Sequence, residues 1–317
     1  MTNLIPIEEL VKEKGIGRIT LKRIEDSLGL KYVNELVLFN AEELSERTGI
    51  DVERAEKILR AARRLVKPTK ATRVSEISEV GEYLTTGIGS LDTLLGGGLK
   101  TGELYEFAGE YGSGKTQLCH QLAVTVQLPP AKGGLGAACC YIDTEGTFSK
   151  MRIEKISGRF GVEDALDNIY YVRVITVGEL EDFVIENLQG LVRENNVRLI
   201  IIDSIIALYR SQFRGREWLA RRQQRINYLL DWLKRLSITF DNIIAYTNQV
   251  LEQPVPFGTS IKIPCGGNII AHAATHRFII RKAKDHRIIE CIDSPRIPYR
   301  ASALFTIKED GLYDYEA

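Results

Sequence analysis

The segment that decides the fold runs from Leu104-Tyr105-Glu106-Phe107-Ala108 directly into Gly109-Glu110-Tyr111-Gly112-Ser113-Gly114-Lys115-Thr116. Its first part predicts a buried strand, and its second part matches the pattern GxxxxGK[ST], which joins a strand to a helix. The glycines let backbone N–H groups close around phosphate groups, and the following helix turns the positive end of its dipole toward them. The alternative, a glycine-rich turn without a ligand, is disfavoured because a strand and a helix flank the pattern.

Apolar runs alternate with longer helical stretches around this segment, which predicts an α/β fold with a parallel sheet buried on both faces. The predicted strands are residues 104–108, 137–143, 169–175, 199–203 and 243–247, and the predicted helices are residues 115–127, 150–160, 177–194 and 217–236. After His272, three β-rich runs at 277–282, 287–292 and 303–307 have no helices between them. We expect these runs to continue the sheet as antiparallel strands.

The N-terminal part has a different pattern, that of short amphipathic helices. They are predicted at residues 7–14, 19–28, 32–38, 41–48 and 52–65. Gly15 and Gly49 lie in two similar breaks, each a tight turn before a helix that begins with polar residues. This is the outline of two helix-hairpin-helix units packed as one all-α domain over residues 1–66. Residues 67–82 are polar and weakly patterned, as expected of a linker, and the α/β core follows over 83–317.

The composition limits the classes of partner. The 317 residues hold 42 Lys and Arg and 42 Asp and Glu, so an anionic partner must be met by local basic patches. The five cysteines have no CxxC spacing and are expected to be buried thiols. An odd cysteine count without a secretory leader predicts a cytoplasmic protein, and the absence of an apolar stretch of about 20 residues predicts no membrane partner.

Four side chains are candidates for nucleotide chemistry. We expect Lys115 to reach the β- and γ-phosphates of ATP and Thr116 to ligate Mg²⁺. Asp203 ends an apolar strand and can hold the water shell of the metal, although such a residue on its own is more often a cap or turn residue. Glu145 follows the end of another strand, where α/β sheets bind ligands, and is the candidate general base. A solvated loop glutamate is the alternative for Glu145.

Gln249 follows the strand predicted at 243–247 and precedes a long irregular segment. Its amide is placed to sense the γ-phosphate and to pass its presence to the following loop. An amide side chain at such a position can equally be a simple loop anchor.

Three segments are candidates for contact with nucleic acid. Residues 209–225 are rich in arginine, with Tyr209, Phe213 and Trp218 interleaved, which suits a phosphate backbone and stacked bases; a solvated helix face paired with acids elsewhere is the alternative. The arginines of this segment are Arg210, Arg214, Arg216, Arg221, Arg222 and Arg225. Residues 250–268 form a long Pro- and Gly-rich loop with Lys262 as its one formal cation, a poor DNA binder by charge. The turn at Gly15 with its nearby lysines and arginines suits duplex DNA or, alternatively, a protein partner.

Several motifs together resemble one family. They are GEYGSGKTQLCHQLAVTVQL at 109–128, YIDTEGTF at 141–148, LARRQQ at 219–224 and TNQV at 247–250. The sequence resembles the archaeal RadA recombinases, which have the RecA fold and exchange DNA strands. The resemblance implies a RecA-like P-loop ATPase core and a helix-hairpin-helix domain. It also implies filaments on single-stranded DNA, ATP bound between adjacent subunits, and pairing with a homologous duplex.

The resemblance also assigns roles to individual residues. Residues Gly109 to Gln117 match nucleotide-binding positions, with Thr116 and Asp203 at the metal. Glu145 and Gln249 match catalytic positions, Gln249 being the residue that couples ATP to the second DNA-binding loop at 250–267. The other implied sites are Arg152 stacked on adenine, Arg210, Arg216 and Arg222 in the first DNA-binding loop, and Asp293 and His272 facing the nucleotide of the neighbour, with K⁺ near Asp293.

The sequence departs from the pattern of the family at surfaces between subunits. Pro68 stands where the linker of the family has a phenylalanine that plugs into the adjacent subunit, whereas the alanine three residues later is present as Ala71. Losing a buried ring can remove a few kcal/mol of interface energy. Tyr299-Arg300-Ala301 replaces an acidic stretch, and Gln253 replaces an arginine of the second loop.

The leading hypothesis is a DNA-dependent ATPase that polymerises on single-stranded DNA and promotes strand exchange in recombinational repair. The runner-up is a paralogue that binds ATP and DNA as a mediator or regulator without exchanging strands by itself. A hexameric helicase is disfavoured by the N-terminal hairpins and by LARRQQ.

Overall fold

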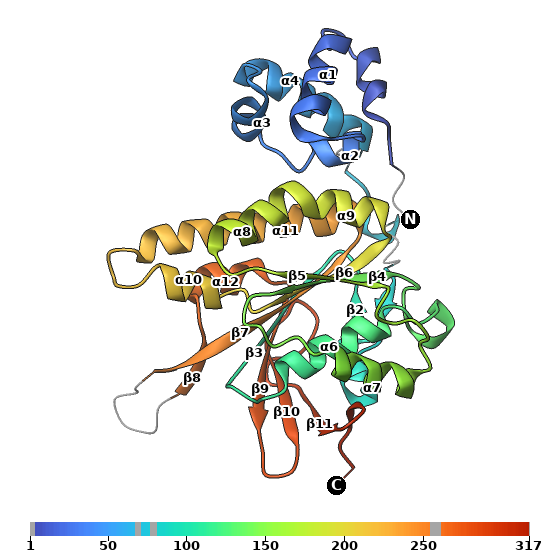
Figure 1. Cartoon of the computed structure of the whole chain (residues 1–317), viewed down its shortest axis with the longest axis vertical. Coiled ribbons are helices and arrows are strands. Elements are labelled where there is room, and N and C mark those ends of the chain that lie inside the picture. The colour runs from blue at the N-terminus through green and yellow to red at the C-terminus, as the bar shows by residue number, and fades with distance from the viewer. Residues whose placement is uncertain (1–3, 67–70, 77–80, 254–260, 317) are drawn as a thin grey trace. The chain divides into compact units, whose positions relative to one another are not determined.

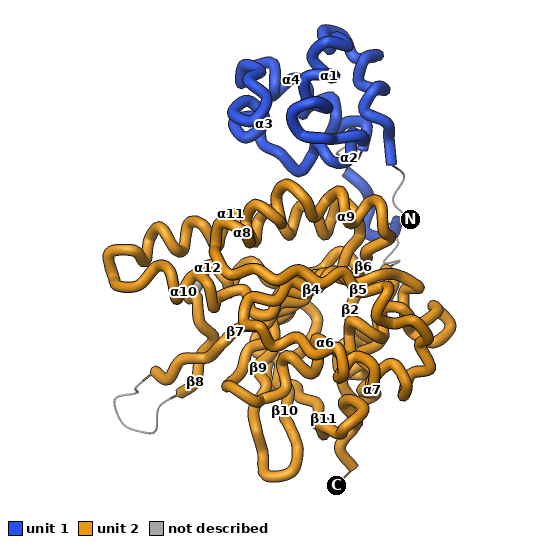
Figure 2. The backbone as a smooth tube through the Cα atoms, in the orientation of Figure 1, with its two compact units in different colours: residues 1–80 blue, residues 81–317 orange. Residues whose placement is uncertain are grey.

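The computed structural model describes residues 4–66, 71–76, 81–253 and 261–316. The chain divides into two compact units, residues 1–80 and 81–317 (Figure 2). Pro68, predicted to lie in an oligomerisation segment, falls outside the described residues. Ala71 is described and exposed, shortly before the 3-10 turn η2 (Val74–Glu76).

The first unit consists of short helices around a small apolar core. They are η1 (Ile7–Lys12), α1 (Arg18–Leu28), α2 (Val33–Leu36), α3 (Ala41–Thr48) and α4 (Val52–Val66). The turns predicted at Gly15 and Gly49 both have positive φ, 90° and 67°, a conformation that glycine adopts without strain. The first helix differs from its prediction, because residues 7–12 form a 3-10 helix.

The second unit is built on a mostly parallel sheet. The strand order is β12-β11-β10-β9-β3-β7-β6-β4-β5, with β8 paired to β7 (Figure 1). The strands are β3 (Leu104–Gly109), β4 (Ala138–Asp143), β5 (Ile169–Arg173), β6 (Val197–Asp203), β7 (Ile243–Gln253), β8 (Ile261–Pro264), β9 (His276–Lys282), β10 (Arg287–Asp293), β11 (Ser302–Lys308) and β12 (Gly311–Asp314). The predicted parallel strands are thereby confirmed, while the short pair β1 (Tyr83–Leu84) and β2 (Leu99–Lys100) was missed.

The C-terminal strands differ from the prediction in one respect. β9 pairs in parallel with β3, so the antiparallel part of the sheet begins only at β10. A parallel partner needs a crossover connection, and the helix α12 (Gly267–Ala273) supplies one between β7 and β9. The sequence prediction ended the helical pattern too early to include it.

Helices cover both faces of this sheet. Figure 1 shows α6 and α7 on one side and α8, α9 and α11 on the other. The helices of the unit are α5 (Gly89–Leu95), α6 (Lys115–Thr125), α7 (Lys150–Phe160), α8 (Val177–Asp182), α9 (Leu188–Glu194), α10 (Ala207–Gln212), α11 (Leu219–Phe240) and α12, with the π-helical turn η4 (Phe183–Asn187) joining α8 to α9 and the 3-10 turn η3 at Pro130–Lys132. No helix in the described part of the chain is long and apolar enough to span a membrane.

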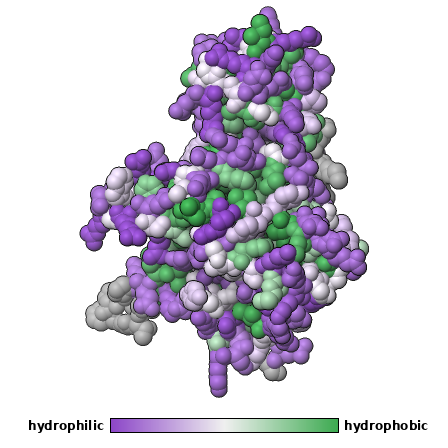
Figure 3. Space-filling view, viewed as in Figure 1, coloured by the Kyte–Doolittle hydropathy of each residue, from purple (hydrophilic) through white to green (hydrophobic). Residues whose placement is uncertain are grey.

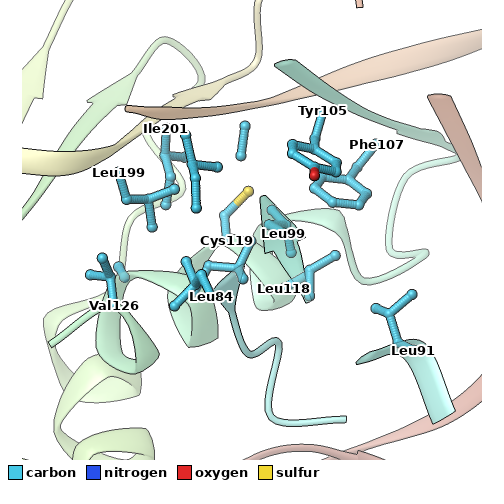
Figure 4. Close-up of a cluster of buried hydrophobic side chains, with 14 of the residues drawn as sticks. Leu84, Leu91, Leu99, Tyr105, Phe107, Leu118, Cys119, Val126, Leu199 and Ile201 are labelled. Atoms are coloured by element: carbon cyan, nitrogen blue, oxygen red, sulfur yellow. The ribbon is translucent and has the colours of Figure 1, made fainter. Parts of the chain in front are cut away.

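One apolar core of the second unit lies between α6 and the sheet. Figure 4 shows Leu118 and Cys119 of α6 near Tyr105, Phe107 and Ile201 of the strands, all of them buried. The cysteines are free and buried, as predicted. The space-filling view in Figure 3 shows hydrophilic side chains over much of the surface it presents, with apolar side chains between them.

The predicted loop at 250–268 is wrong at both of its ends. β7 continues to Gln253 and pairs antiparallel with β8, with Leu251 opposite Ile263 and Glu252 opposite Lys262. Alternating apolar and polar residues give this hairpin two different faces. That alternation was visible in the sequence but was masked by the prolines and glycines around it.

A buried ion pair ties β3 to β9. Glu106 is completely buried and accepts hydrogen bonds from Arg277 Nε at 2.5 Å and from Asn248 Nδ2 at 2.6 Å. Burial raises the pKa of Glu106, and the charge of Arg277 opposes that rise.

We predict that Arg277→Met lowers the free energy of unfolding by roughly 3 kcal/mol, because it leaves a buried carboxyl group without its charged partner. Arg281→Met is the matched control on the same strand, since Arg281 meets Glu290 at 3.3 Å in an exposed pair worth less than about 1 kcal/mol. Urea unfolding measures both. Equal losses for the two variants would contradict a structural role for the buried pair.

Candidate active site

The loop between β3 and α6 has the shape of a phosphate cradle. A Cβ atom at Gly109 would lie 2.6 Å from the carbonyl oxygen of Ile280, and Gly112 and Gly114 have φ values of 69° and 111°. Only glycine fits this backbone without strain. Ser113 Oγ is buried and has no hydrogen-bond partner among the described residues. The loop therefore presents a polar backbone to a ligand, whereas the Ser113 hydroxyl group is buried and lies outside the lining of the cavity.

Lys115 lies on the loop itself. Its Nζ donates hydrogen bonds to the carbonyl oxygens of Gly109 and Glu110, both at 2.9 Å. Burial lowers the pKa of Lys115, and the negative charges of Asp203 and Glu145 oppose that shift. The ammonium group is thus half-buried between the loop and two carboxylates.

Asp203 ends β6 close to Thr116. Its Oδ2 accepts from Thr116 Oγ1 at 2.8 Å and from Tyr141 OH at 2.9 Å, and its Oδ1 accepts from Thr247 Oγ1 at 2.5 Å. Every one of these donors is neutral. Burial therefore raises the pKa of Asp203 despite the three bonds.

These groups fit a magnesium ion that is shared with a nucleotide. The described residues contain no cluster of three or more His, Cys, Asp or Glu side chains that could hold a metal by themselves. Mg²⁺ in nucleotide sites needs no such cluster, since one or two protein oxygens join the phosphates and water. Thr116 and Asp203 would supply the protein oxygens, and the ion would bind phosphate oxygens and offset their charge.

Glu145 is exposed beside the phosphate loop. Its Oε1 accepts from Ser204 Oγ at 2.6 Å and from Gln249 Nε2 at 3.1 Å. It lines two cavities, one of about 280 Å³ with Thr116 and Asp203 and one of about 400 Å³ with Gln249 and Lys262. A carboxylate at this position can orient or deprotonate a water molecule between the two cavities.

Gln249 connects Glu145 to the arginine-rich segment. Its Oε1 accepts from Arg210 Nη1 at 2.8 Å, and the same Nη1 contacts Cys265 Sγ at 3.4 Å. The structure thus brings Glu145, Gln249 and Arg210 into one hydrogen-bonded line.

The arginine-rich segment covers α10 and the start of α11. Arg214, Arg216 and Arg221 are exposed, and Arg222 is half-buried. Arg225 instead donates to both carboxylate oxygens of Glu181, from Nη2 to Oε2 at 2.5 Å and from Nε to Oε1 at 3.0 Å. That bond raises the pKa of Arg225. The alternative of pairing with acids elsewhere therefore holds for Arg225.

The predicted stacking of bases on this segment is wrong for two of its aromatic residues. Tyr209 is completely buried and donates its hydroxyl hydrogen to Glu181 at 2.7 Å, and Phe213 is 8% exposed. Trp218 is 42% exposed. Tyr209 and Phe213 lie one helical turn apart and face the interior, so of the three aromatic rings Trp218 is presented to solvent.

Arg152 of α7 and Gln117 of α6 are hydrogen-bonded to each other. Arg152 Nε donates to Gln117 Oε1 at 2.5 Å, and its guanidinium also donates to the carbonyl oxygens of Lys308, at 2.7 Å, and Glu309. Burial lowers the pKa of Arg152. Gln117 and Ile307 line the same cavity as Thr116, whereas Arg152 lies behind Gln117, outside the lining of that cavity.

Asp293 and His272 are not brought to the phosphate loop of their own chain. Asp293 is exposed and lies opposite Arg277, toward the end of the sheet away from the loop. His272 lines a separate cavity between α11 and α12. Neither residue lines the cavities around Glu145.

Three residues of the site were missed from the sequence. Tyr141 and Thr247 bond Asp203, and Lys262 Nζ forms a 2.7 Å ion pair with Glu110 of the phosphate loop. The Lys262 bond lowers the pKa of Glu110. The signal for Tyr141 and Thr247 was their place on strands next to β6, whereas the contact of Lys262 depends on the unforeseen hairpin.

The comparison with known families agrees with this geometry. A family model described as Rad51 matches residues 78–315. The chain belongs to the Rad51 family. Members of this family are RecA-type recombinases, DNA-dependent ATPases that use ATP with Mg²⁺, bind DNA and form oligomeric filaments. The archaeal RadA group within it stays a prediction.

We predict that Glu145→Gln lowers the turnover number for ATP at least about 100-fold, because an amide cannot accept a proton from the attacking water. Binding of MgATP should change little, since the phosphate loop is untouched. Steady-state hydrolysis and fluorescent-nucleotide titration measure the two effects. Glu154→Gln on the exposed face of α7 is the control. Unchanged turnover in Glu145→Gln would remove the residue from its role.

Proposed function

We propose that the chain is a DNA-dependent ATPase that assembles on single-stranded DNA and promotes homologous pairing and strand exchange in recombinational repair. The observation that carries the proposal is the line Glu145–Gln249–Arg210, with bonds of 3.1 and 2.8 Å. It joins the candidate base for hydrolysis to an arginine of the candidate DNA-binding segment. Loss of the γ-phosphate would change the hydrogen-bond partners of Glu145 and Gln249. Because Arg210 is bonded to Gln249, its position would change as well.

In this proposal, ATP acts as a switch that controls binding of DNA, and its hydrolysis is not used to generate force. Arg214, Arg216 and Arg221 are exposed cations of the arginine-rich segment at 209–225. With ATP bound, the segment would be ordered for a phosphate backbone, and Trp218 would stack on a base. After hydrolysis, the segment would release the strand. Such a cycle needs only that one state of the nucleotide favours one arrangement of the segment.

In this proposal, residues of the neighbouring subunit complete the nucleotide site. Asp293 and His272 are exposed and lie away from the phosphate loop of their own chain, as suits groups that face the nucleotide of the next subunit. K⁺ at Asp293 is part of the proposal. Ala71 and Pro68 would contact the neighbour through the linker at 67–82, and Ala71 is exposed.

The first unit is proposed to be a helix-hairpin-helix domain that holds duplex DNA by its backbone. Its support is the pair of glycine turns with positive φ and the exposed cations Lys14, Arg18 and Lys22 near the first turn. Backbone amides and cations can bind phosphates without reading sequence. We propose the domain bounds 1–66, 67–82 and 83–317 and a cytoplasmic location.

One observation favours a mediator that binds ATP and DNA without exchanging strands by itself. Tyr299 is 68% exposed, and Arg300 stacks over its ring at 5.4 Å. The corresponding stretch of the RadA pattern is acidic. A cation and an exposed ring would bind a different surface from the one that an acidic stretch binds. This favours a partner other than a second copy of this chain.

The two functions are separated by a D-loop assay with ATP, run beside electron microscopy of the protein on single-stranded DNA. Strand exchange predicts filaments and joint molecules, and Lys115→Ala should abolish both because it removes the cation at the phosphate loop. A mediator predicts neither product from the wild type alone. Hydrolysis that persists in Lys115→Ala would show that another site binds the ATP.

We predict that Arg216→Ala weakens binding of single-stranded DNA and makes its salt dependence shallower. Each phosphate contact on a single strand contributes about 0.7 to the slope of log K against log salt concentration. Fluorescence anisotropy over a range of NaCl concentrations measures the slope. Arg281→Ala, which removes an exposed cation from β9, should leave it unchanged. A slope that is equal in Arg216→Ala and wild type would exclude this arginine from the interface.

A further inference from the structure

The carboxylate of Asp143 is the anchor of the loop that carries Glu145. Asp143 ends β4 and is completely buried. Its Oδ1 accepts from the backbone amides of Glu145, Gly146 and Thr147, at 3.0, 2.6 and 3.3 Å, and its Oδ2 accepts from that of Phe148 at 3.2 Å. A single side chain therefore holds four consecutive amides of the turn.

Two residues of the next strand complete the surroundings of this carboxylate. Tyr171 OH donates to Oδ2 at 3.2 Å, and Arg173 Nη1 donates to the carbonyl oxygen of Asp143 at 2.8 Å and lies 3.8 Å from Oδ1. Hydrogen bonds to an ionised acceptor are stronger than those between neutral groups. The buried charge thus has enough donors to offset the loss of water.

Glu145 has few other restraints. Its side chain is exposed and accepts hydrogen bonds from Ser204 and Gln249 within the site. Its position therefore depends on the backbone at 145–148. β4 and β6 pair with Asp143 opposite Asp203, so the anchor of this turn and the metal carboxylate are neighbours in the sheet.

We propose that Asp143 is a positioning residue for hydrolysis, which acts by fixing the turn that presents Glu145 to the attacking water. The proposal rests on the proposed ATPase function. Asp143 is not expected to touch the nucleotide, because the hydrogen bonds of its carboxylate come from the turn and from Tyr171 of β5. Displacing a reacting group by about 1 Å can cost up to 100-fold in rate, so a loosened turn should lower turnover while leaving binding of MgATP intact.

The test is a double-mutant cycle of Asp143→Asn and Glu145→Gln, measured as DNA-stimulated hydrolysis and as binding of a fluorescent ATP analogue. Asparagine keeps the shape but replaces one acceptor oxygen by an N–H donor. We expect Asp143→Asn to lower the turnover number about 10- to 100-fold with KM for ATP within about twofold. In the Glu145→Gln background it should have no further effect, because Asp143 acts through Glu145. If the losses in turnover of the two single variants multiply in the double variant, the proposal is overturned.

Hydrogen exchange gives a second measurement that needs no activity. Amides 145–148 should exchange faster in Asp143→Asn than in wild type, while the amides of β6 stay protected. Asp92→Asn is the matched control, since Asp92 also accepts from a backbone amide, that of Thr86 at 2.7 Å, but far along the chain from the site. Unchanged exchange at 145–148 would overturn the proposal.

The outcomes separate this proposal from the proposed function. A wild type without DNA-stimulated hydrolysis would contradict the function, and the exchange data would still decide whether Asp143 fixes the turn. If Asp143→Asn does not fold, Tyr171→Phe takes its place in the cycle, because it removes one donor to the same carboxylate and should give a smaller loss of the same kind.

Discussion

The parallel register of four central strands is the constraint on which the rest of the second unit depends. Gly109 of β3 lies opposite Gln249 of β7, and Asp143 of β4 lies opposite Asp203 of β6. Because parallel strands end at the same edge, this register collects the phosphate loop, two carboxylates and an amide there. A shift by one residue would turn each of these side chains to the opposite face of the sheet and remove the site. The apolar cores on both faces prevent that shift.

Buried polar groups are concentrated at this edge for the same reason. Asp143 and Asp203 end largely apolar strands at this edge, and Glu106 lies farther back within β3. Donors from neighbouring strands reach Glu106 and Asp203, and Asp143 accepts from its own turn and from Tyr171 of β5. Leaving any one of them without its donors would cost the desolvation of a charged group. The carboxyl ends of these strands are therefore held in place by polar contacts as well as by packing. This explains how an exposed residue such as Glu145 can have a defined position.

Much of this arrangement follows from the sequence, because short apolar runs that end in Asp203 and Asp143 have few other folds available. The strand, loop and helix around the phosphate loop could be predicted, because its glycines act through the backbone and its lysine and threonine stand at a fixed spacing. Tyr209 and Phe213 could not be assigned correctly, because an aromatic residue between arginines has the same pattern whether it faces solvent or the core. Their orientation depends on a residue far away in the sequence. Glu181 of α8 accepts hydrogen bonds from both Tyr209 and Arg225 and holds them toward the interior. The β7–β8 hairpin likewise depends on pairing across a segment whose prolines indicate a loop.

Lys115 and Asp203 show how burial prepares the site for its ligand. Burial lowers the pKa of the lysine and raises that of the aspartate, so both charged forms are disfavoured by the same loss of water. The charge of Asp203 opposes the shift in the pKa of Lys115, and hydrogen bonds from Thr247, Thr116 and Tyr141 oppose the shift in the pKa of Asp203, but neither shift is removed. A ligand with a metal ion near Asp203 and phosphate oxygens near Lys115 supplies each group with the opposite charge that it lacks. We therefore expect metal and nucleotide to bind together more tightly than either alone, since each stabilises one of the two charges. Under the proposed function, these two groups would bind the complex of ATP with Mg²⁺ better than ATP or the ion separately.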